Sequence, residues 1–171
     1  MKLDRFAVEA YRMNTPKWAF DPKSGAGAAQ HGGRVNRPGL HALYLSLEQR
    51  TAILEYQQDE PLMPPGTLVS YVVNVDPIAD FRGGYSSKWP AVWQDFYCDW
   101  RSILLSGIDP PSWAIGDDAL KNGAKGIAFR SQRAVGGFNL ILYTETLTAS
   151  DVLDVFDPQG ALPKDQKSWS P

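Results

Sequence analysis

The sequence has only one cysteine and two histidines in 171 residues. The single thiol, Cys98, excludes an intramolecular disulfide and is typical of a reducing compartment. His31 and His41 are too few for a metal site of the usual kind, so we expect no metal. No window approaches the roughly 18 apolar residues of a membrane helix. The opening residues, MKLDRFAVEAYRMN, lack the apolar run of a secretory signal. We therefore expect a cytoplasmic protein that does not enter a membrane.

The chain also carries little net charge and few motifs of common enzymes. A net charge of −2 with no polybasic tail disfavours direct binding of nucleic acid. There is no GxxxxGK[ST] phosphate loop and no Ser-His-Asp or Cys-His set. GAGAA at residues 25–29 half-matches the dinucleotide fingerprint GxGxxG, but it does not join a clear strand to a clear helix. The length fits one domain over residues 1–171, with a core at about 6–157 and a frayed tail at 158–171.

The hydrophobic periodicity predicts an α+β fold with a mixed, mostly antiparallel sheet and flanking helices. A long loop is expected at 14–33, Ser46 is expected to cap the first helix, and Gly123 to close the third. The expected strands are 6–13, 43–46, 67–75, 127–131, 139–144 and 152–156, and the expected helices are 47–57, 91–105 and 113–122.

The stretch from Gly25 to Glu55 delivers three chemically useful side chains from three kinds of backbone. Arg34 follows two glycines, and its guanidinium could bind a diphosphate bidentately. Tyr44 lies in an apolar strand, where its ring could stack on a flat ligand. Glu55 lies in a helix, where its carboxylate could stabilise the cation that develops when an N-glycosidic bond breaks. Taken singly, the three residues are better explained as a surface arginine, a core tyrosine and an exposed helix acid.

Further candidates come from both ends of the domain. Tyr11 and Arg12 end the first strand, where Arg12 could supply a second cation for a pyrophosphate. Ser131 ends a later strand and could bond a carboxamide or a ribose hydroxyl, and Asn139 could help to hold that loop. The alternatives are an edge-strand pair and a strand-end hydroxyl satisfied by backbone.

Together these motifs resemble the RES domain. The similarity rests on their order and spacing over about residues 11–144. They are Tyr11-Arg12, the Gly/Ala loop, GGRVNRPG, ALYLS, the helix with Glu55, and FRSQR followed by NLILY. The family is named for an arginine, a glutamate and a serine, which here fall on Arg34, Glu55 and Ser131.

The resemblance implies a fold like that of ADP-ribosylating toxins, and NAD as a substrate. RES proteins are the toxins of bacterial RES–Xre toxin–antitoxin pairs. Some degrade NAD by hydrolysis or phosphorolysis, whereas a ParT-like branch transfers ADP-ribose to phosphoribosyl pyrophosphate synthetase. The implied partner is an Xre-type antitoxin that occludes the active site in a hetero-oligomer. Transfer and destruction both stay open, as does a non-catalytic nucleotide-binding or interaction module.

The resemblance also assigns roles to individual residues. Glu55 and Arg34 would be catalytic, with Glu55 serving the ribose and Arg34 sharing the diphosphate with Arg12. The NAD-binding set it implies is Tyr11, Arg12, Arg34, Tyr44, Ser131 and Asn139. Two departures, Val35 in place of an aromatic residue and the segment TPKWAFDP after the first strand, are expected to alter the pocket rim.

Overall fold

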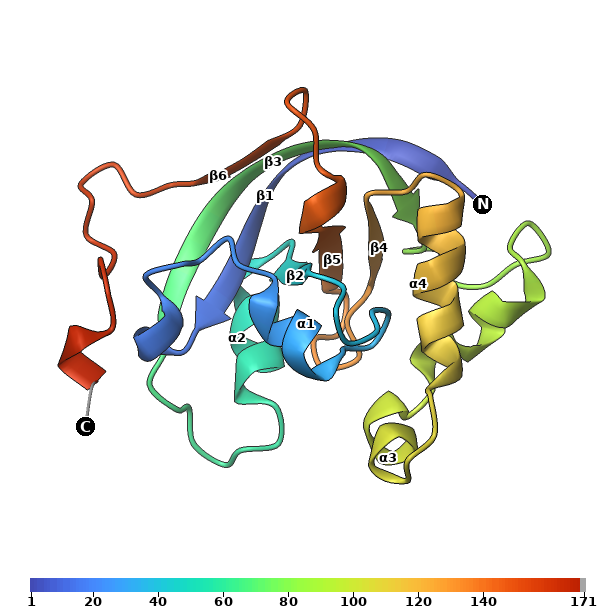
Figure 1. Ribbon diagram of the computed structural model, residues 1–171, viewed down its shortest axis with the longest axis horizontal. Helices are drawn as coiled ribbons and strands as arrows, with labels where there is room; N and C mark the ends of the chain where they lie inside the picture. The colour runs from blue at the N-terminus through green and yellow to red at the C-terminus, as the bar shows by residue number, and fades with distance from the viewer. Residues whose placement is uncertain (170–171) are drawn as a thin grey trace.

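The computed structural model describes residues 1–169 and has six strands in one sheet (Figure 1). The sheet order is β1-β2-β5-β4-β3-β6, and within the described residues only the β3–β4 pair is parallel. The predicted α+β class is therefore confirmed. The strands are β1 (Leu3–Asn14), β2 (Ala42–Ser46), β3 (Thr67–Asp80), β4 (Gly126–Arg130), β5 (Phe138–Tyr143) and β6 (Val152–Val155).

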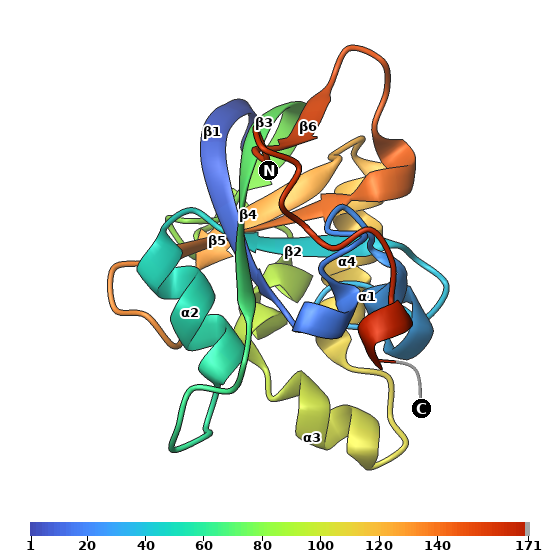
Figure 2. The ribbon, with the colours of Figure 1, turned by 90° about the vertical axis from the view of Figure 1, so that its left-hand side faces the viewer.

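The sheet curves so strongly that β1 pairs with both β2 and β3. β1 pairs with β3 along most of its length, and Figure 2 shows the two as one long curved ribbon pair. β1 also pairs with β2, but only through Tyr11 and Ser46. The ring β1-β2-β5-β4-β3 is thus closed by a single residue pair, which lies beside the pocket described below.

The sequence predicts the helices less well than the strands. The α-helices are α1 (Ala26–His31), α2 (Gln49–Gln57), α3 (Trp100–Leu105) and α4 (Pro111–Lys121), and short 3-10 turns are η1 (Pro16–Trp18), η2 (Ala91–Tyr97), η3 (Thr144–Thr146) and η4 (Lys167–Trp169). The expected loop at 14–33 contains η1 and α1. Gly123 follows α4 with a φ of 81°, so the expected stop is confirmed.

Two expectations about helices are wrong. The single helix expected at 91–105 is instead η2 followed by α3. The backbone becomes extended at Cys98, and Asp99 then caps α3 by accepting from the Ser102 amide. Ser46 does not cap α2. The helix begins at Gln49, and the Ser46 hydroxyl donates to Asn139 instead.

The core consists of two clusters on opposite faces of the sheet. Because side chains alternate along a strand, β5 contributes Leu140 and Leu142 to one cluster and Ile141 and Tyr143 to the other. The second of these faces is covered by α4 and by the aromatic side chains of η2. β5 is therefore buried on both sides and lies at the centre of the core beside the site.

The C-terminal segment follows the outside of this body. Leu162 packs against one core cluster, and the Gln166 side chain donates to the Lys17 carbonyl. Of the tail expected to be frayed, residues 170 and 171 lie outside the described residues. In residues 1–169 no helix combines the length and apolar character needed to cross a membrane.

Candidate active site

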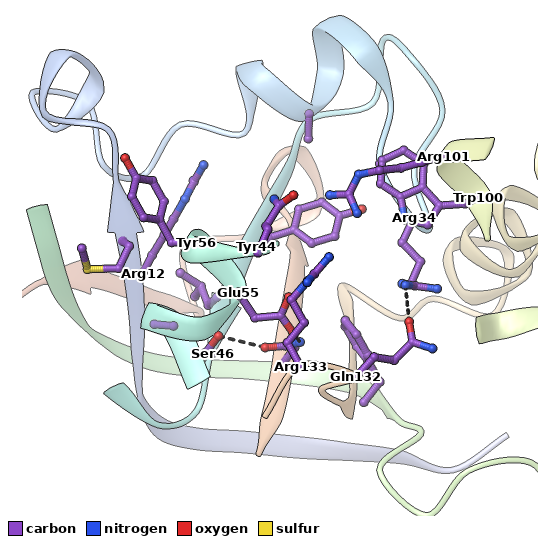
Figure 3. A pocket seen from close by; sticks show the side chains of 18 of the residues that line it. Arg12, Arg34, Tyr44, Ser46, Glu55, Tyr56, Trp100, Arg101, Gln132 and Arg133 are labelled. Carbon is purple, nitrogen blue, oxygen red and sulfur yellow. Dashed lines mark hydrogen bonds between the residues drawn. The ribbon is translucent and has the colours of Figure 1, made fainter. Parts of the chain in front are cut away.

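A cavity of about 830 Å³ opens between β1, β2, the C-terminal part of α2 and the segment leading into α3 (Figure 3). This volume is within the usual range for small-molecule sites. Six of the seven predicted site residues line it, namely Tyr11, Arg12, Arg34, Tyr44, Glu55 and Asn139. The seventh, Ser131, lies behind Glu55.

Glu55 is held by two donors on the same oxygen. Its Oε1 accepts from the Ser131 hydroxyl at 2.7 Å and from the Asn139 side-chain amide at 2.6 Å. Within residues 1–169 its Oε2 accepts no hydrogen bond from the protein. One oxygen therefore fixes the carboxylate while the other is available to a ligand in the cavity.

The two donors are themselves fixed. The Ser131 oxygen accepts from the backbone amides of Arg133 at 3.0 Å and Ala134 at 2.9 Å, so its proton is directed to Glu55. The Asn139 oxygen accepts from the Ser46 hydroxyl at 2.8 Å, which turns the Asn139 amide nitrogen toward Glu55. The geometry of Glu55 thus comes from a network and not from α2 alone.

Arg34 is bonded to the opposite wall of the cavity. Its Nη1 donates to the carbonyls of Phe96 at 3.0 Å and Cys98 at 3.3 Å, and its Nη2 donates to the Gln132 side chain at 2.6 Å (Figure 3). Burial lowers the pKa of Arg34, although an arginine still keeps its charge. Arg34 therefore orders the η2–α3 segment in addition to placing charge in the pocket.

The backbone that carries Arg34 is held by side chains from α4 and β5. Trp113 donates to the Gly33 carbonyl at 2.7 Å, Ser112 to the Arg34 carbonyl at 2.5 Å, and Tyr143 to the Val35 carbonyl at 2.9 Å. Three successive carbonyls that a loop would normally present to water are thus satisfied by the core.

Asn36 and Tyr44 complete the support of this loop. The buried Asn36 side chain donates to the carbonyls of Ala28 and Leu40, and its oxygen accepts from the Tyr44 hydroxyl at 2.7 Å. A methyl group at Gly33 would overlap that hydroxyl, which explains the glycine. Burial raises the pKa of Tyr44, so the phenol stays neutral. The Tyr44 side chain also lines the cavity.

Arg12 has few partners for a charged group inside the cavity. The residue is half-buried, and burial lowers the pKa of its guanidinium. Its Nη1 donates to the Ser24 carbonyl at 3.4 Å, and within residues 1–169 it forms no ion pair. A partly buried charge without a counterion loses some of its hydration, so this guanidinium is suited to an anionic ligand. Tyr11, its neighbour, donates to Glu9 on the exposed side of β1.

The two sequence departures do not alter the pocket rim as expected. Val35 is fully buried in a core cluster, and neither it nor the segment 15–22 lines the cavity. For Val35 the reason is that successive side chains of GGRVN point in opposite directions, so Arg34 faces the cavity and Val35 faces the core.

Sequence reasoning missed several residues that line the cavity. They include Ser46, Trp100, Arg101, Gln132 and Arg133. Gln132 and Arg133 directly follow Ser131, so that motif was the available signal, whereas nothing in the local sequence marks Trp100 or Arg101. In residues 1–169 no cluster of His, Cys, Asp or Glu could hold a metal.

The cavity is cationic although the chain is slightly acidic. Four arginines line it, against two carboxylates, and the six residues are Arg12, Arg34, Arg101, Arg133, Glu55 and Asp99. This local excess of positive charge suits a ligand with several negative charges.

The sequence model of the RES domain matches residues 9–165. This chain belongs to the RES domain family. In this RES domain Arg34 and Glu55 come from one stretch of the chain, and Ser131 comes from a distant segment. Glu55 and Ser131 are in contact although 76 residues separate them.

No curated protein sequence matches this RES domain significantly. Among solved structures it is similar to the M. tuberculosis MbcT-MbcA toxin-antitoxin complex. The TM-score is 0.59 at 17% sequence identity, over 89% of this chain and 84% of the other. At this identity the likeness shows the shared fold.

Proposed function

We propose that this RES domain is the toxin of a type II toxin–antitoxin pair and cleaves the nicotinamide–ribose bond of NAD. The observation that carries the proposal is Glu55, a carboxylate fixed through one oxygen in a cavity lined by four arginines. The family membership supports the choice of NAD as substrate.

Glu55 would act on the charge that develops during cleavage. When the C1′–N bond breaks, nicotinamide leaves with the bonding electron pair as a neutral molecule, and the ribose acquires oxocarbenium character. A carboxylate already held in place stabilises this cation more than it stabilises the ground state. Its second oxygen can accept a hydrogen bond from a ribose hydroxyl.

The other predicted residues would bind the rest of the dinucleotide. Arg12 and Arg34 would supply positive charge for the diphosphate, and Arg12 has donors free to do so. Tyr11 and Tyr44 would line the nicotinamide side. Ser131 and Asn139, predicted as NAD-binding residues, are better placed to position Glu55 than to touch the ligand themselves.

The fate of the ADP-ribose depends on the nucleophile that attacks C1′. Water or phosphate would destroy NAD, whereas a side chain of an acceptor protein, with phosphoribosyl pyrophosphate synthetase as the candidate, would become ADP-ribosylated. The structural relative is a toxin–antitoxin complex, which supports an antitoxin partner. We propose an Xre-type antitoxin that covers the cavity in a cytoplasmic hetero-oligomer.

The purified chain incubated with NAD should release nicotinamide, which chromatography measures. Labelled NAD added to a bacterial lysate separates the two fates. A labelled protein band indicates transfer, and free ADP-ribose or its phosphate indicates destruction. No nicotinamide in buffer, phosphate or lysate would overturn the proposal, and NAD binding without release would indicate a non-catalytic nucleotide-binding module.

Expression in bacteria provides an independent test of the biological role. The chain alone should arrest growth, and co-expression of the neighbouring antitoxin gene should restore it. Normal growth of cells that contain the soluble, folded chain would contradict the toxin assignment.

A further inference from the structure

Arg133 and Asp59 form a two-pronged ion pair at the edge of the cavity. Arg133 Nη1 donates to Asp59 Oδ1 at 2.8 Å and Nη2 to Oδ2 at 3.0 Å. The Asp59 side chain is 89% exposed, whereas that of Arg133 is 27% exposed. The pair joins the turn after α2 to the β4–β5 loop, and the Glu55–Ser131 contact joins α2 itself to the same loop.

The backbone at both ends of the pair is fixed. The Arg133 amide donates to Ser131, which holds its main chain beside Glu55. On the other side, Gln58 ends α2 with a φ of 52°, the only positive φ of a non-glycine residue in 1–169. This unfavourable conformation turns the chain so that Asp59 lies opposite Arg133.

Besides its contact with Asp59, Arg133 also faces the cavity. It lines the same cavity as Glu55, and Figure 3 shows its side chain among the labelled cavity residues. The Asp59 hydrogen bonds raise the pKa of Arg133, and the charge of Glu55 adds to this effect.

Arg34 and Arg133 both line the cavity but differ in the cost of changing partners. Two of the Arg34 hydrogen bonds go to the backbone carbonyls of Phe96 and Cys98, and both carbonyls would lose this donor if Arg34 changed partners. Arg133 is bonded to an exposed carboxylate that water can solvate. An exposed ion pair contributes little, so this one can be exchanged.

We propose that Arg133 is an anion-binding residue of the cavity, and that its guanidinium exchanges Asp59 for a phosphate oxygen when a diphosphate ligand binds. Asp59 holds the guanidinium in place while the cavity is empty and competes with the ligand. The identity of the diphosphate as part of NAD rests on the function proposed above, whereas the anion subsite itself does not.

Calorimetric titration of the intact chain with inorganic pyrophosphate, and separately with ADP-ribose, tests this exchange. Arg133→Gln should weaken both ligands at least about tenfold, because a charge-assisted hydrogen bond is lost. Asp59→Asn should instead tighten both by about two- to fivefold, the value of an exposed pair. The double variant should equal Arg133→Gln, since Asp59 acts only through Arg133.

Glu60→Gln is the matched control for charge. Glu60 is the next exposed acid, does not line the cavity and forms no ion pair within residues 1–169. Its substitution should leave both affinities unchanged. Equal tightening by Glu60→Gln, weakening by Asp59→Asn, or unchanged affinity in Arg133→Gln would each overturn the proposal, as would a wild-type chain that binds neither ligand. Normal behaviour of these variants without any NAD cleavage would leave the exchange standing and remove only the enzymatic function.

Discussion

At the scale of single residues, the central feature is that Glu55 is fixed through Oε1 alone. Glu55→Gln keeps the shape of the side chain, and the amide oxygen can still accept from Ser131 and Asn139. We expect nicotinamide release to fall about 10²- to 10³-fold because the negative charge is lost. NAD affinity, measured by calorimetry, should change little.

A control variant separates this effect from general loss of charge. Glu60→Gln makes the same chemical change five residues along the chain, outside the cavity. It should retain full NAD cleavage and the same melting temperature. Substantial turnover in Glu55→Gln would refute the role given to this carboxylate.

At the same scale, the sequence allowed the chemically distinctive residues to be found but not their partners. Arg34, Tyr44 and Glu55 lie close together in the chain and fit a family motif. The residues that orient Glu55 act through contacts over long sequence separations, such as Ser46 with Asn139, 93 residues away. Spacing along a chain carries no information about such contacts until strand register is known, so Ser46 was taken for a helix cap.

At the scale of elements, the site depends on how closely α4 approaches the loop that carries Arg34. Gly116 on α4 lies against Val35, and a methyl group there would overlap the Val35 carbonyl oxygen. We expect Gly116→Ala to move the loop and destabilise the fold by about 1–3 kcal/mol, the usual cost of overpacking. NAD binding should weaken with it, as measured by melting temperature and calorimetry.

Gly27→Ala is the matched control at this scale. Gly27 lies in α1, and no atom lies within 4 Å of the position of an added methyl group. Since alanine is the better helix former by about 1 kcal/mol, this variant should be as stable as the wild type or more so. If Gly116→Ala behaved like Gly27→Ala, tight packing of α4 on the loop would not be what holds Arg34.

Strands were also easier to predict than helices, for a physical reason. β3 and β5 are long apolar or alternating runs whose burial is decided by their own residues. The segment 91–105 has helical spacing, but its first part packs Trp93 and Phe96 into the aromatic cluster as a 3-10 turn. Tertiary packing there overrides local propensity, which no window of sequence can show.

At the scale of the whole molecule, the ring closure follows from pairings that sequence could not specify. β3 pairs with β1 along residues 67–79, with β6 at residues 71–74 and with β4 at residues 79 and 80. The buried carboxylate of Asp151 connects this region. It accepts from Lys125 at 2.7 Å, from the Thr148 amide at 2.8 Å, and from the Asp76 amide at 3.3 Å. β3, the residue before β4 and the connection from β5 to β6 thus meet at one charge.

This charge makes the stability of the fold depend on pH. Burial alone would raise the pKa of Asp151, but the hydrogen bonds from Lys125 and Thr148 hold this pKa well below its usual range. The unfolded chain, with an ordinary pKa of about 3.9, therefore binds the proton more readily. The stabilisation is present above about pH 4 and is lost as the pH falls below that value toward the lowered pKa.

Asp151→Asn should accordingly lower the free energy of unfolding at neutral pH by about 2 kcal/mol, the scale of a charged hydrogen bond. Urea denaturation at neutral pH and at about pH 3 measures the effect, and the gap between variant and wild type should narrow in acid because protonation removes the same charge. Asp154→Asn, an exposed acid on β6, should leave stability unchanged at both. A gap of equal size at both pH values would mean that Asp151 stabilises the ring by shape and not by charge.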